Sequence, residues 1–445
     1  MNNVTNESRL EKFFQLKARN TSVRTELVAG LTTFMTMSYI LIVNPNMLSA
    51  TGMDKGGVFT ATIIASVVAT LMMALMANLP FALAPGMGLN AFFTYSICLG
   101  MGKDWRFALT AVFLEGIIFL LLSLFKVREF IFEAIPITLK KAVSCGIGLF
   151  IALIGLNSAG IVGTGKGTVL GLGNLLTPQS AVFFFGLLVA ALLTAKNIKG
   201  ALFAGIVSST VLALILGVVQ LPTSIFSLPP SMAPVGLQLQ WEHVFTWEMF
   251  SVMFTFLFVD IFDTVGTLAG VATKAGLIDE KGRLPKVGNA LFADAAGTTV
   301  GALCGTSTIT TFVESAAGVA DGGRTGLTSV STAFWFVVSL FFFPLISIVP
   351  PQATASALVI VGLFMLTPIK EINFADFTES IPAYITMLMM PFSYSIAEGI
   401  SFGMISYVVL KVLSGKGKEV SLLMYILSLL FAVRIFWPLL QPLLG

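Results

Sequence analysis

The sequence predicts an all-α polytopic membrane protein with fourteen transmembrane segments in a seven-plus-seven inverted repeat, followed by an extra C-terminal apolar segment. Three observations lead to this prediction: a very apolar composition, regularly spaced apolar stretches, and similarity between the two halves. Of the 445 residues, 56% are hydrophobic and only 11% are charged, and the mean hydropathy is +0.94. Soluble globular domains do not reach such values, so the chain needs the lipid bilayer as its solvent.

The apolar stretches have the length that a membrane span needs. A transmembrane helix takes about 20 apolar residues, and stretches of roughly that length follow one another with short connections. They lie near residues 24–43, 58–78, 81–100, 106–125, 138–160, 180–196, 199–218, 248–272, 286–303, 304–320, 325–343, 350–367, 380–395, 397–413 and 420–441. The sequence does not settle whether 420–441 is an extra span or an interfacial helix.

Basic residues predict the orientation of these spans. Lys and Arg gather in alternate connections, for example at Lys140 and Lys199, whereas the long connection 219–247 contains none. By the positive-inside rule, the basic connections and the N-terminus are cytoplasmic, and the chain lies in the cell inner (plasma) membrane. The net charge of +3 is small, and no nucleic-acid-binding pattern is found. The three cysteines lack metal-ligand spacing, so we expect no cofactor.

The two halves of the chain resemble each other. Residues 136–154 and 351–369 share a pattern in which Gly148 and Gly362 take the same place, and the spans that follow match as well. Seven spans separate the two copies. Because seven is an odd number, the second copy has the opposite orientation in the membrane. This is the inverted-repeat plan of secondary transporters.

Two apolar stretches at corresponding positions of the halves contain helix-breaking residues. The third stretch includes Pro85, Gly86 and Gly88, and the tenth begins with a run of small and hydroxyl residues at 305–311. Irregular backbone at membrane depth is stable only where protein or a cavity satisfies its N–H and C=O groups. One such segment would indicate a packing kink, but a matched pair predicts the central binding site of a transporter.

Acidic residues at membrane depth point to the same region. Helical spacing in the eighth stretch puts four polar residues on one face, namely Asp260, Asp263, Thr264 and Thr267. Glu314 lies beside the second interruption. A carboxylate in the membrane costs about 2.5–3.5 kcal/mol on insertion scales, so such residues usually serve ion, proton or substrate movement. Asp260, Asp263 and Glu314 are therefore the candidates for proton coupling.

Other polar residues leave two interpretations open. For Glu115 in the fourth stretch and Asp294 in the ninth, a structural hydrogen-bonded role fits the sequence as well as a functional one. We expect Asp321 and Arg324 to form a structural ion pair at the inner end of the tenth stretch. The only histidine, His243, lies in the outer connection, so any proton coupling must use carboxylates.

Five long motifs are distributed over the chain, at residues 25–34, 84–93, 258–268, 314–327 and 389–400. They include Ala-Pro-Gly-Met-Gly-Leu-Asn-Ala-Phe-Phe in the third stretch and Phe-Val-Asp-Ile-Phe-Asp-Thr-Val-Gly-Thr-Leu in the eighth. These motifs resemble the nucleobase–cation symporter-2 (nucleobase–ascorbate transporter) superfamily, specifically its AzgA-like branch of adenine and guanine/hypoxanthine permeases. The resemblance covers essentially the whole chain.

The resemblance implies a core domain and a gate domain, each assembled from both repeats. The expected divisions are 1–23 for a cytoplasmic N-terminal segment, 24–125 and 248–343 for the core, 126–218 and 344–413 for the gate, 219–247 for an outside loop and 414–445 for a C-terminal segment. The resemblance is also compatible with a homodimer.

The motifs also imply site residues. By position, Asp263 and Glu314 would contact the substrate, together with the third stretch at Leu89 and Asn90. Neighbouring residues complete the predicted substrate-binding set: Gly88, Thr267, Val313, Ser315 and Thr311. One departure matters, because uracil-type relatives have a histidine where Thr267 stands, so their histidine-based proton route does not transfer to this chain.

These observations predict a secondary active transporter that imports purine nucleobases with protons, not an enzyme. Purine N–H groups can bond to carboxylates, and an aromatic residue such as Phe312 beside an acid suits a flat heteroaromatic ligand. A same-fold transporter of sulfate or bicarbonate is the first alternative, although two acids would repel a dianion. A membrane-embedded enzyme is the second, although no nucleophile–base pair is apparent. The choice between adenine and guanine or hypoxanthine stays open.

Overall fold

Helices form along almost the whole chain, as the apolar stretches predict. The computed structural model describes residues 9–124, 135–165, 168–277 and 284–440. In this part of the chain, eight helices are long and apolar enough to cross a membrane, and three shorter apolar helices accompany them. The prediction of a polytopic helical membrane protein is therefore confirmed, while the count of fourteen spans stays a prediction.

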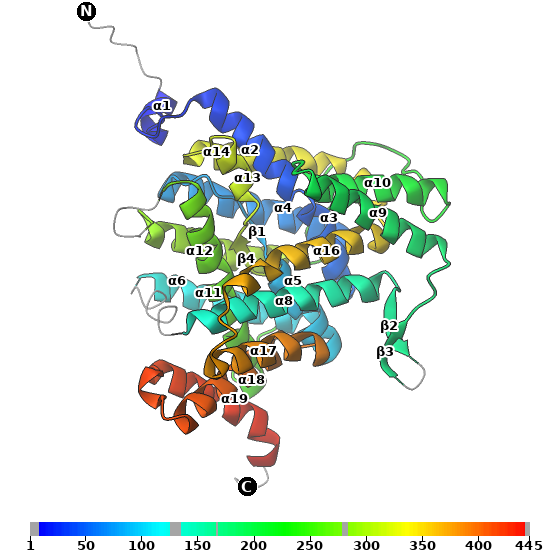
Figure 1. Cartoon of the computed structure of the whole chain (residues 1–445). Helices are drawn as coiled ribbons and strands as arrows, with labels where there is room; N and C mark the ends of the chain where they lie inside the picture. Colours follow the sequence, from blue (N-terminus) through cyan, green and yellow to red (C-terminus); the bar gives the residue numbers. More distant parts are fainter. Residues whose placement is uncertain (1–8, 125–134, 166–167, 278–283, 441–445) are drawn as a thin grey trace, which may run out of the picture.

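The first helix group combines helices from both halves of the chain. In it, α12 packs on α4 and α6, and α14 packs on α2 and α4 (Figure 1). Its helices are α2 (Val23–Met37), α3 (Ile40–Ser49), α4 (Lys55–Met72), α5 (Met87–Ala91), α6 (Trp105–Leu124), α11 (Trp247–Lys274), α12 (Val287–Cys304), α13 (Ser315–Ala320) and α14 (Gly326–Ser339). Two π-helical segments, η1 (Met73–Ala77) and η2 (Phe92–Gly100), extend α4 and α5.

A buried carboxylate joins α2 to α14. Glu26 is fully buried and accepts hydrogen bonds from the backbone N–H groups of Arg324, Thr325 and Thr328. The hydroxyls of Thr325 and Thr328 donate to it as well. The first N–H groups of a helix have no partner within the helix, and they attract negative charge. Glu26 therefore stabilises the start of α14 and fixes α2 against it.

The second helix group also draws on both halves. It comprises α8 (Ile137–Ser158), α9 (Pro178–Ala195), α10 (Ala201–Ile215), α16 (Pro351–Leu366), α17 (Phe377–Phe392) and α18 (Ile396–Leu413). At its centre α8 and α16 lie side by side (Figure 1). The two glycines matched by the repeat meet there, because a Cβ on Gly148 would lie 2.5 Å from the carbonyl oxygen of Gly362 and the reverse distance would be 2.4 Å. Only glycine allows this approach of the two backbones.

The two interrupted segments meet as a small β-sheet in the first helix group. β1 (Leu83–Pro85) and β4 (Ile309–Thr311) pair antiparallel, with Ala84 opposite Thr310 (Figure 1). Both strands are buried. Since backbone N–H and C=O groups at membrane depth must be satisfied by protein or a cavity, each broken strand supplies partners for the other. The predicted interruptions are confirmed, and their antiparallel pairing is what an inverted repeat produces.

The remaining elements lie at the ends and edges of the two groups. They are α1 (Arg9–Phe14), the hairpin β2 (Val162–Gly165) and β3 (Thr168–Leu172), η3 (Leu340–Phe342), α15 (Phe343–Ser347), η4 (Thr367–Glu371), η5 (Gly417–Glu419) and α19 (Leu422–Leu440). The extra apolar segment predicted near 420–441 is thus helical. It packs on α18, where Arg434 donates to Glu398 at 2.9 Å and to Ser401 at 3.1 Å.

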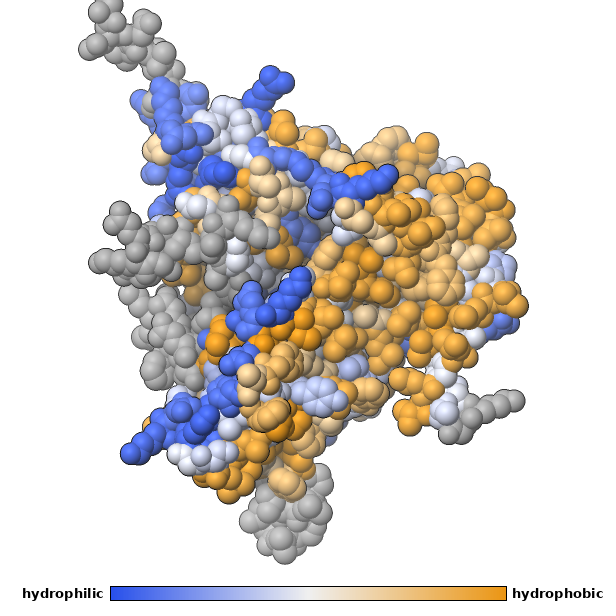
Figure 2. All heavy atoms as spheres, in the orientation of Figure 1, coloured by the Kyte–Doolittle hydropathy of each residue, from blue (hydrophilic) through white to orange (hydrophobic). Residues whose placement is uncertain are grey.

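The surface is apolar over the second helix group. Figure 2 shows hydrophobic residues covering the side formed by α9, α10 and the later part of α8, whereas hydrophilic residues gather near α1 and toward the left of the view. Large apolar side chains of α9 and α10 are exposed there, among them Phe184, Leu188 and Val211. A continuous apolar surface of this extent fits contact with lipid, since soluble monomers rarely expose one.

Candidate substrate-binding site

A cavity of about 800 Å³ lies between the two helix groups. The first group contributes the α2–α3 junction, the β1–α5 segment, α11 and the β4–α13 segment, and the second group contributes α8, α9, α10 and α16. Small-molecule sites in proteins usually have volumes of roughly 300–1,000 Å³. Residues from both groups line it, including Thr36, Tyr39, Gly86, Met87, Gly88, Ser144, Ile147, Asp263, Thr267, Thr310, Thr311, Phe312, Val313, Glu314 and Met365.

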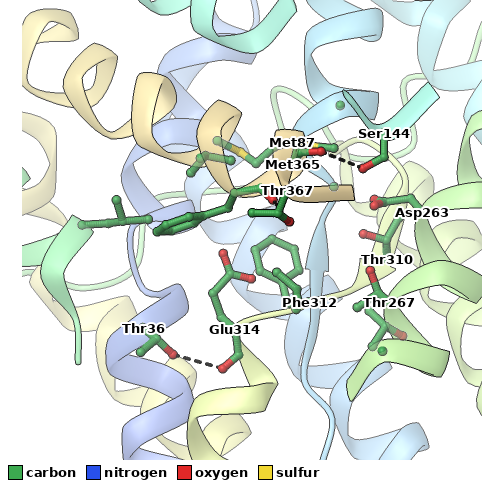
Figure 3. Close-up of a pocket in the computed structure, with 18 of the residues that line it drawn as sticks. Thr36, Met87, Ser144, Asp263, Thr267, Thr310, Phe312, Glu314, Met365 and Thr367 are labelled. Carbon is green, nitrogen blue, oxygen red and sulfur yellow. Dashed lines mark hydrogen bonds between the residues drawn. The ribbon is translucent and has the colours of Figure 1, made fainter. Parts of the chain in front are cut away.

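Two acids from different elements reach this cavity. Asp263 lies on α11, and the hydroxyl of Thr310 from β4 lies beside its carboxylate (Figure 3). Glu314 is the residue just before α13, and the hydroxyl of Tyr39 donates to its carboxylate at 2.6 Å. Figure 3 shows the Phe312 ring between Glu314 on one side and Asp263 with Thr310 on the other. The strand pair thus brings two carboxylates and an aromatic face into one space.

Glycine makes the approach of these groups sterically feasible. A Cβ on Gly86 would lie 2.8 Å from the Thr310 hydroxyl oxygen and 3.3 Å from a carboxylate oxygen of Asp263. A Cβ on Gly88 would lie 2.8 Å from a methyl carbon of Ile147 on α8. The glycines of the third apolar stretch therefore serve two purposes: Gly86 leaves room for the acid and its hydroxyl partner, and Gly88 lets α5 contact the second helix group.

Six residues of the predicted substrate-binding set line the cavity, namely Asp263, Glu314, Thr267, Gly88, Val313 and Thr311. Val313 is half exposed, which in a chain of this kind places it at an open part of the wall. Thr311 is nearly buried, and its hydroxyl has no hydrogen-bond partner among the described residues. The hydroxyl oxygen is itself buried, so contact with a ligand would require a small shift of the wall.

Three predicted contacts lie behind the cavity wall instead. Leu89 is fully buried in the hydrophobic core. Asn90 is fully buried as well, and its amide donates back to the carbonyl of Pro85 at 3.4 Å. The Ser315 hydroxyl accepts from the backbone N–H of Ala82 at 3.0 Å, so it holds the strand pair together. On α5 and α13, successive side chains point in different directions, and only part of each segment can face the cavity.

Asp260 also points away from the cavity. It is fully buried, and the Thr264 hydroxyl lies 3.0 Å from its carboxylate and 3.0 Å from that of Asp294. On α11, Asp260 and Thr264 lie one turn apart on one stripe, whereas Asp263 and Thr267 form the neighbouring stripe. The face predicted from helical spacing therefore divides in two, and only one half lines the cavity.

Both residues left open between structural and functional roles have hydrogen-bonded positions in the first helix group. Asp294 belongs to the cluster with Thr264 just described. Glu115 is fully buried and accepts from the Thr308 hydroxyl at 2.9 Å, directly before β4. These contacts stabilise the irregular segment before β4, which supports the structural interpretation for Glu115.

Basic residues surround one end of the cavity, where Lys140, Lys141 and Lys199 line it. Lys199, next to α10, forms an ion pair with Asp321, which follows α13. Asp321 therefore forms an ion pair across the two helix groups, and the expected pair with Arg324 is wrong. The guanidinium of Arg324 donates to backbone carbonyls instead. Although partial burial opposes ionisation of Asp321, hydrogen bonds from Lys199 and Thr32 and the charge of Lys199 hold its pKa below the usual value. The pair is lost only as pH falls through that lowered value.

Sequence reasoning missed the hydroxyl groups that hold the two acids. Tyr39 is the only tyrosine in the first apolar stretch, and a lone phenolic hydroxyl at membrane depth is the signal that could have identified it. Thr310 was part of a recognised hydroxyl-rich run, but the sequence does not show which of its members faces Asp263. The part of the wall formed by the second group was also missed, where the Ser144 hydroxyl donates to the carbonyl of Met365 at 3.1 Å (Figure 3).

The chemistry of this site is that of hydrogen-bond acceptors beside an aromatic surface. Among the described residues, no ion pair involves Asp263 or Glu314. Carboxylates without a cationic partner are strong acceptors for N–H groups of a neutral ligand. They would repel an anion, which makes the sulfate or bicarbonate alternative a poor match to this cavity.

Comparisons with known proteins point in the same direction as the motifs. Residues 24–402 match the sequence profile of the Permease family. A permease of Methanocaldococcus jannaschii is 51% identical, over 96% of this chain and 98% of that protein. The adenine permease AdeQ of Escherichia coli is 41% identical, with 97% of each chain covered. The guanine/hypoxanthine permease PbuG of Bacillus subtilis is 44% identical, over 95% of this chain and 98% of that protein.

A solved structure shares the fold. The transmembrane domain of the cyanobacterial bicarbonate transporter BicA superposes with a TM-score of 0.62 at 15% sequence identity, over 84% of this chain and 96% of that chain. At this level of identity the likeness concerns the arrangement of helices alone. The chain therefore has a known transporter fold.

Proposed function

The chain belongs to the permease family that includes these adenine and guanine/hypoxanthine permeases, and on that premise we propose that it imports purine nucleobases by proton symport with alternating access. The observation that carries the proposal is the meeting of Asp263 and Glu314 in one cavity between the two helix groups. Neither acid has a cationic partner among the described residues, so both can receive N–H groups of a neutral heterocycle.

A purine matches this cavity in shape and in hydrogen bonding. It presents N–H groups at its edges, which two carboxylates on different elements can accept, and ring nitrogens or oxygens that accept from hydroxyls such as those of Thr267 and Thr311. Phe312, nearly buried in the wall between the acids (Figure 3), offers a flat surface for the ring. The site requires a ligand with donors on more than one edge.

Protons would couple through carboxylates, because the only histidine, His243, is exposed in a loop. We assign binding chiefly to Glu314 and coupling chiefly to Asp263. Asp260 would take part from behind the wall, through the hydroxyl of Thr264. A carboxyl group that takes up a proton loses its charge, so proton binding and substrate binding depend on each other.

Transport requires the site to open to each side of the membrane in turn. In this proposal the first helix group is the core domain and the second is the gate domain, and the core moves against the gate. By the positive-inside rule, the lysines at one end of the cavity mark the cytoplasmic side of the plasma membrane. The structure would then be an inward-facing state, closed on the outside where Gly88 meets Ile147.

Uptake of radiolabelled bases by cells that lack their own purine permeases tests the proposal. We expect saturable uptake of adenine, guanine or hypoxanthine, inhibited by the other purines but not by excess sulfate or uracil, and abolished by a protonophore. Absence of purine uptake together with saturable uptake of radiolabelled sulfate would favour the anion alternative. Sodium dependence without a protonophore effect at clamped voltage would refute proton coupling while leaving purine transport in place.

A further inference from the structure

Tyr39 occupies an irregular point of the first membrane-spanning segment. α2 ends at Met37 and α3 begins at Ile40. Between them the backbone tightens, because the N–H groups of Leu41 and Ile42 bond to carbonyls three residues earlier. Such tightened turns often mark functional positions within helices. Here the turn places the Tyr39 side chain in the cavity wall.

The Tyr39 side chain is built into the site on two sides. Its hydroxyl donates to Glu314 at 2.6 Å across 275 residues of sequence. This length lies within the normal range of an O–H···O hydrogen bond. Its ring centroid lies 6.5 Å from that of Phe312, at an interplanar angle of 44°. Since Tyr39 is only 1% exposed, surrounding side chains hold its hydroxyl against Glu314 and its ring against Phe312.

The hydrogen-bond partner of Glu314 is a neutral phenol and not a cation, and this difference affects how well the carboxylate accepts other hydrogen bonds. A lysine or arginine beside Glu314 would orient the carboxylate but would also cancel its charge and weaken it as an acceptor. A phenol hydroxyl supplies one neutral donor and leaves the remaining lone pairs of the carboxylate for other N–H groups. Beside Asp263 the nearby polar side chain is also a hydroxyl, that of Thr310. Among the described residues, hydroxyls and not cations therefore lie next to both acids.

We propose that Tyr39 is a positioning residue of the purine site, whose hydroxyl fixes the Glu314 carboxylate in the orientation that receives the ligand. This inference rests on the proposed function and adds a residue to it. Tyr39 acts through Glu314, the acid to which we assign binding, and its hydroxyl donates to Glu314 and not to Asp263. Its loss should therefore weaken substrate binding and leave the turnover of bound substrate almost unchanged.

The variant Tyr39→Phe keeps the ring and its contact with Phe312 and removes one O–H. We expect the KM for purine uptake, and the Kd measured on purified protein, to rise about tenfold, as the loss of one charge-assisted bond would allow. The maximal rate should change by less than about twofold, because KM alone reports binding that is equal in ground and transition states. Tyr95→Phe is the matched control, since Tyr95 packs on Tyr394 and is not among the residues lining the cavity.

A double-mutant cycle separates positioning from general stability. Tyr39→Phe should add no further loss of purine affinity in a Glu314→Ala background, because that background lacks the acceptor of the Tyr39 hydroxyl and an effect that passes through Glu314 disappears with it. Equal affinity of Tyr39→Phe and the unaltered protein would overturn the inference. So would an equal loss in Tyr95→Phe, or full additivity with Glu314→Ala, since both indicate a structural effect. Absence of purine binding by the unaltered protein would instead refute the proposed function itself.

Discussion

Replacing Glu314 by glutamine tests the site with the smallest change in shape. The new side chain has the same size, and the Tyr39 hydroxyl can still donate to its amide oxygen. The other oxygen, however, becomes an NH₂ group. Where a purine N–H found an acceptor, it would now meet a donor, and the negative charge would be gone.

The contacts of Glu314 indicate how much purine affinity the Glu314→Gln variant should lose. Hydrogen bonds to a charged group contribute about 1.5–3 kcal/mol, and about 1.4 kcal/mol corresponds to a tenfold change in affinity. Because no ion pair of the described residues neutralises Glu314, no neighbouring charge compensates for the change. We therefore expect purine binding to weaken by about ten- to a hundredfold.

The assay combines binding and transport. Purine binding is measured on purified protein, and concentrative uptake is measured in proteoliposomes with an imposed pH gradient. Glu314→Gln should keep pH-dependent uptake at high substrate, whereas Asp263→Asn should bind purine but fail to concentrate it. Glu248→Gln serves as a control, because Glu248 pairs with Lys103 at the surface, at 2.5 Å. Normal concentrative uptake by both amide variants of the two acids would refute the site assignment.

Three further predictions concern the cavity and the movement around it. A cysteine replacing Thr311 should react with small polar thiol reagents and be protected by saturating purine; inertness with and without substrate would contradict an aqueous site. Gly148→Ala should destabilise the protein by about 1–3 kcal/mol, because its Cβ would lie 2.5 Å from the carbonyl oxygen of Gly362, and an unchanged thermal midpoint in detergent would disprove this. An ion pair such as Lys199–Asp321 should stabilise the inward-facing state by up to about 1 kcal/mol. Lys199→Asp should therefore slow cytoplasmic labelling of the cysteine at 311 by up to about fivefold, and adding Asp321→Lys should restore the labelling rate. A further decrease of the rate in the double variant would exclude a role for the pair.

Much of the site was predictable because membrane depth restricts where polar residues can occur. Asp263 and Glu314 stand out in apolar surroundings, and the helix breakers around Gly86 and in 305–311 stand out from a helical pattern. Both signals are local in sequence and need no knowledge of packing. Their combination was sufficient to locate the cavity and six of its predicted lining residues.

The predicted residues that lie behind the cavity wall do so for two physical reasons. Helical spacing separates opposite faces well but neighbouring stripes poorly, so Asp260 and Asp263 could not be distinguished by periodicity alone. Asn90 and Ser315 lie on the short helices α5 and α13, which have too few turns for a sequence pattern to show which side faces the cavity. Their side chains bond to backbone groups of β1 and of the residue before it, which the sequence could not reveal because the strand pairing joins segments far apart in the chain.

The sequence by itself indicated that the chain lies in a lipid bilayer, that it is helical, that its two halves form an inverted repeat, and that acids lie at membrane depth near the interrupted segments. Each of these follows from composition or from sequence patterns. Only the tertiary structure decided that the interruptions pair as β1 and β4, that Tyr39 and Thr310 lie next to the acids, and that Lys199 meets Asp321 across the helix groups. These contacts join residues 47 to 275 positions apart, or pair strands of opposite halves. Their partners are selected by packing, and packing depends on the whole fold.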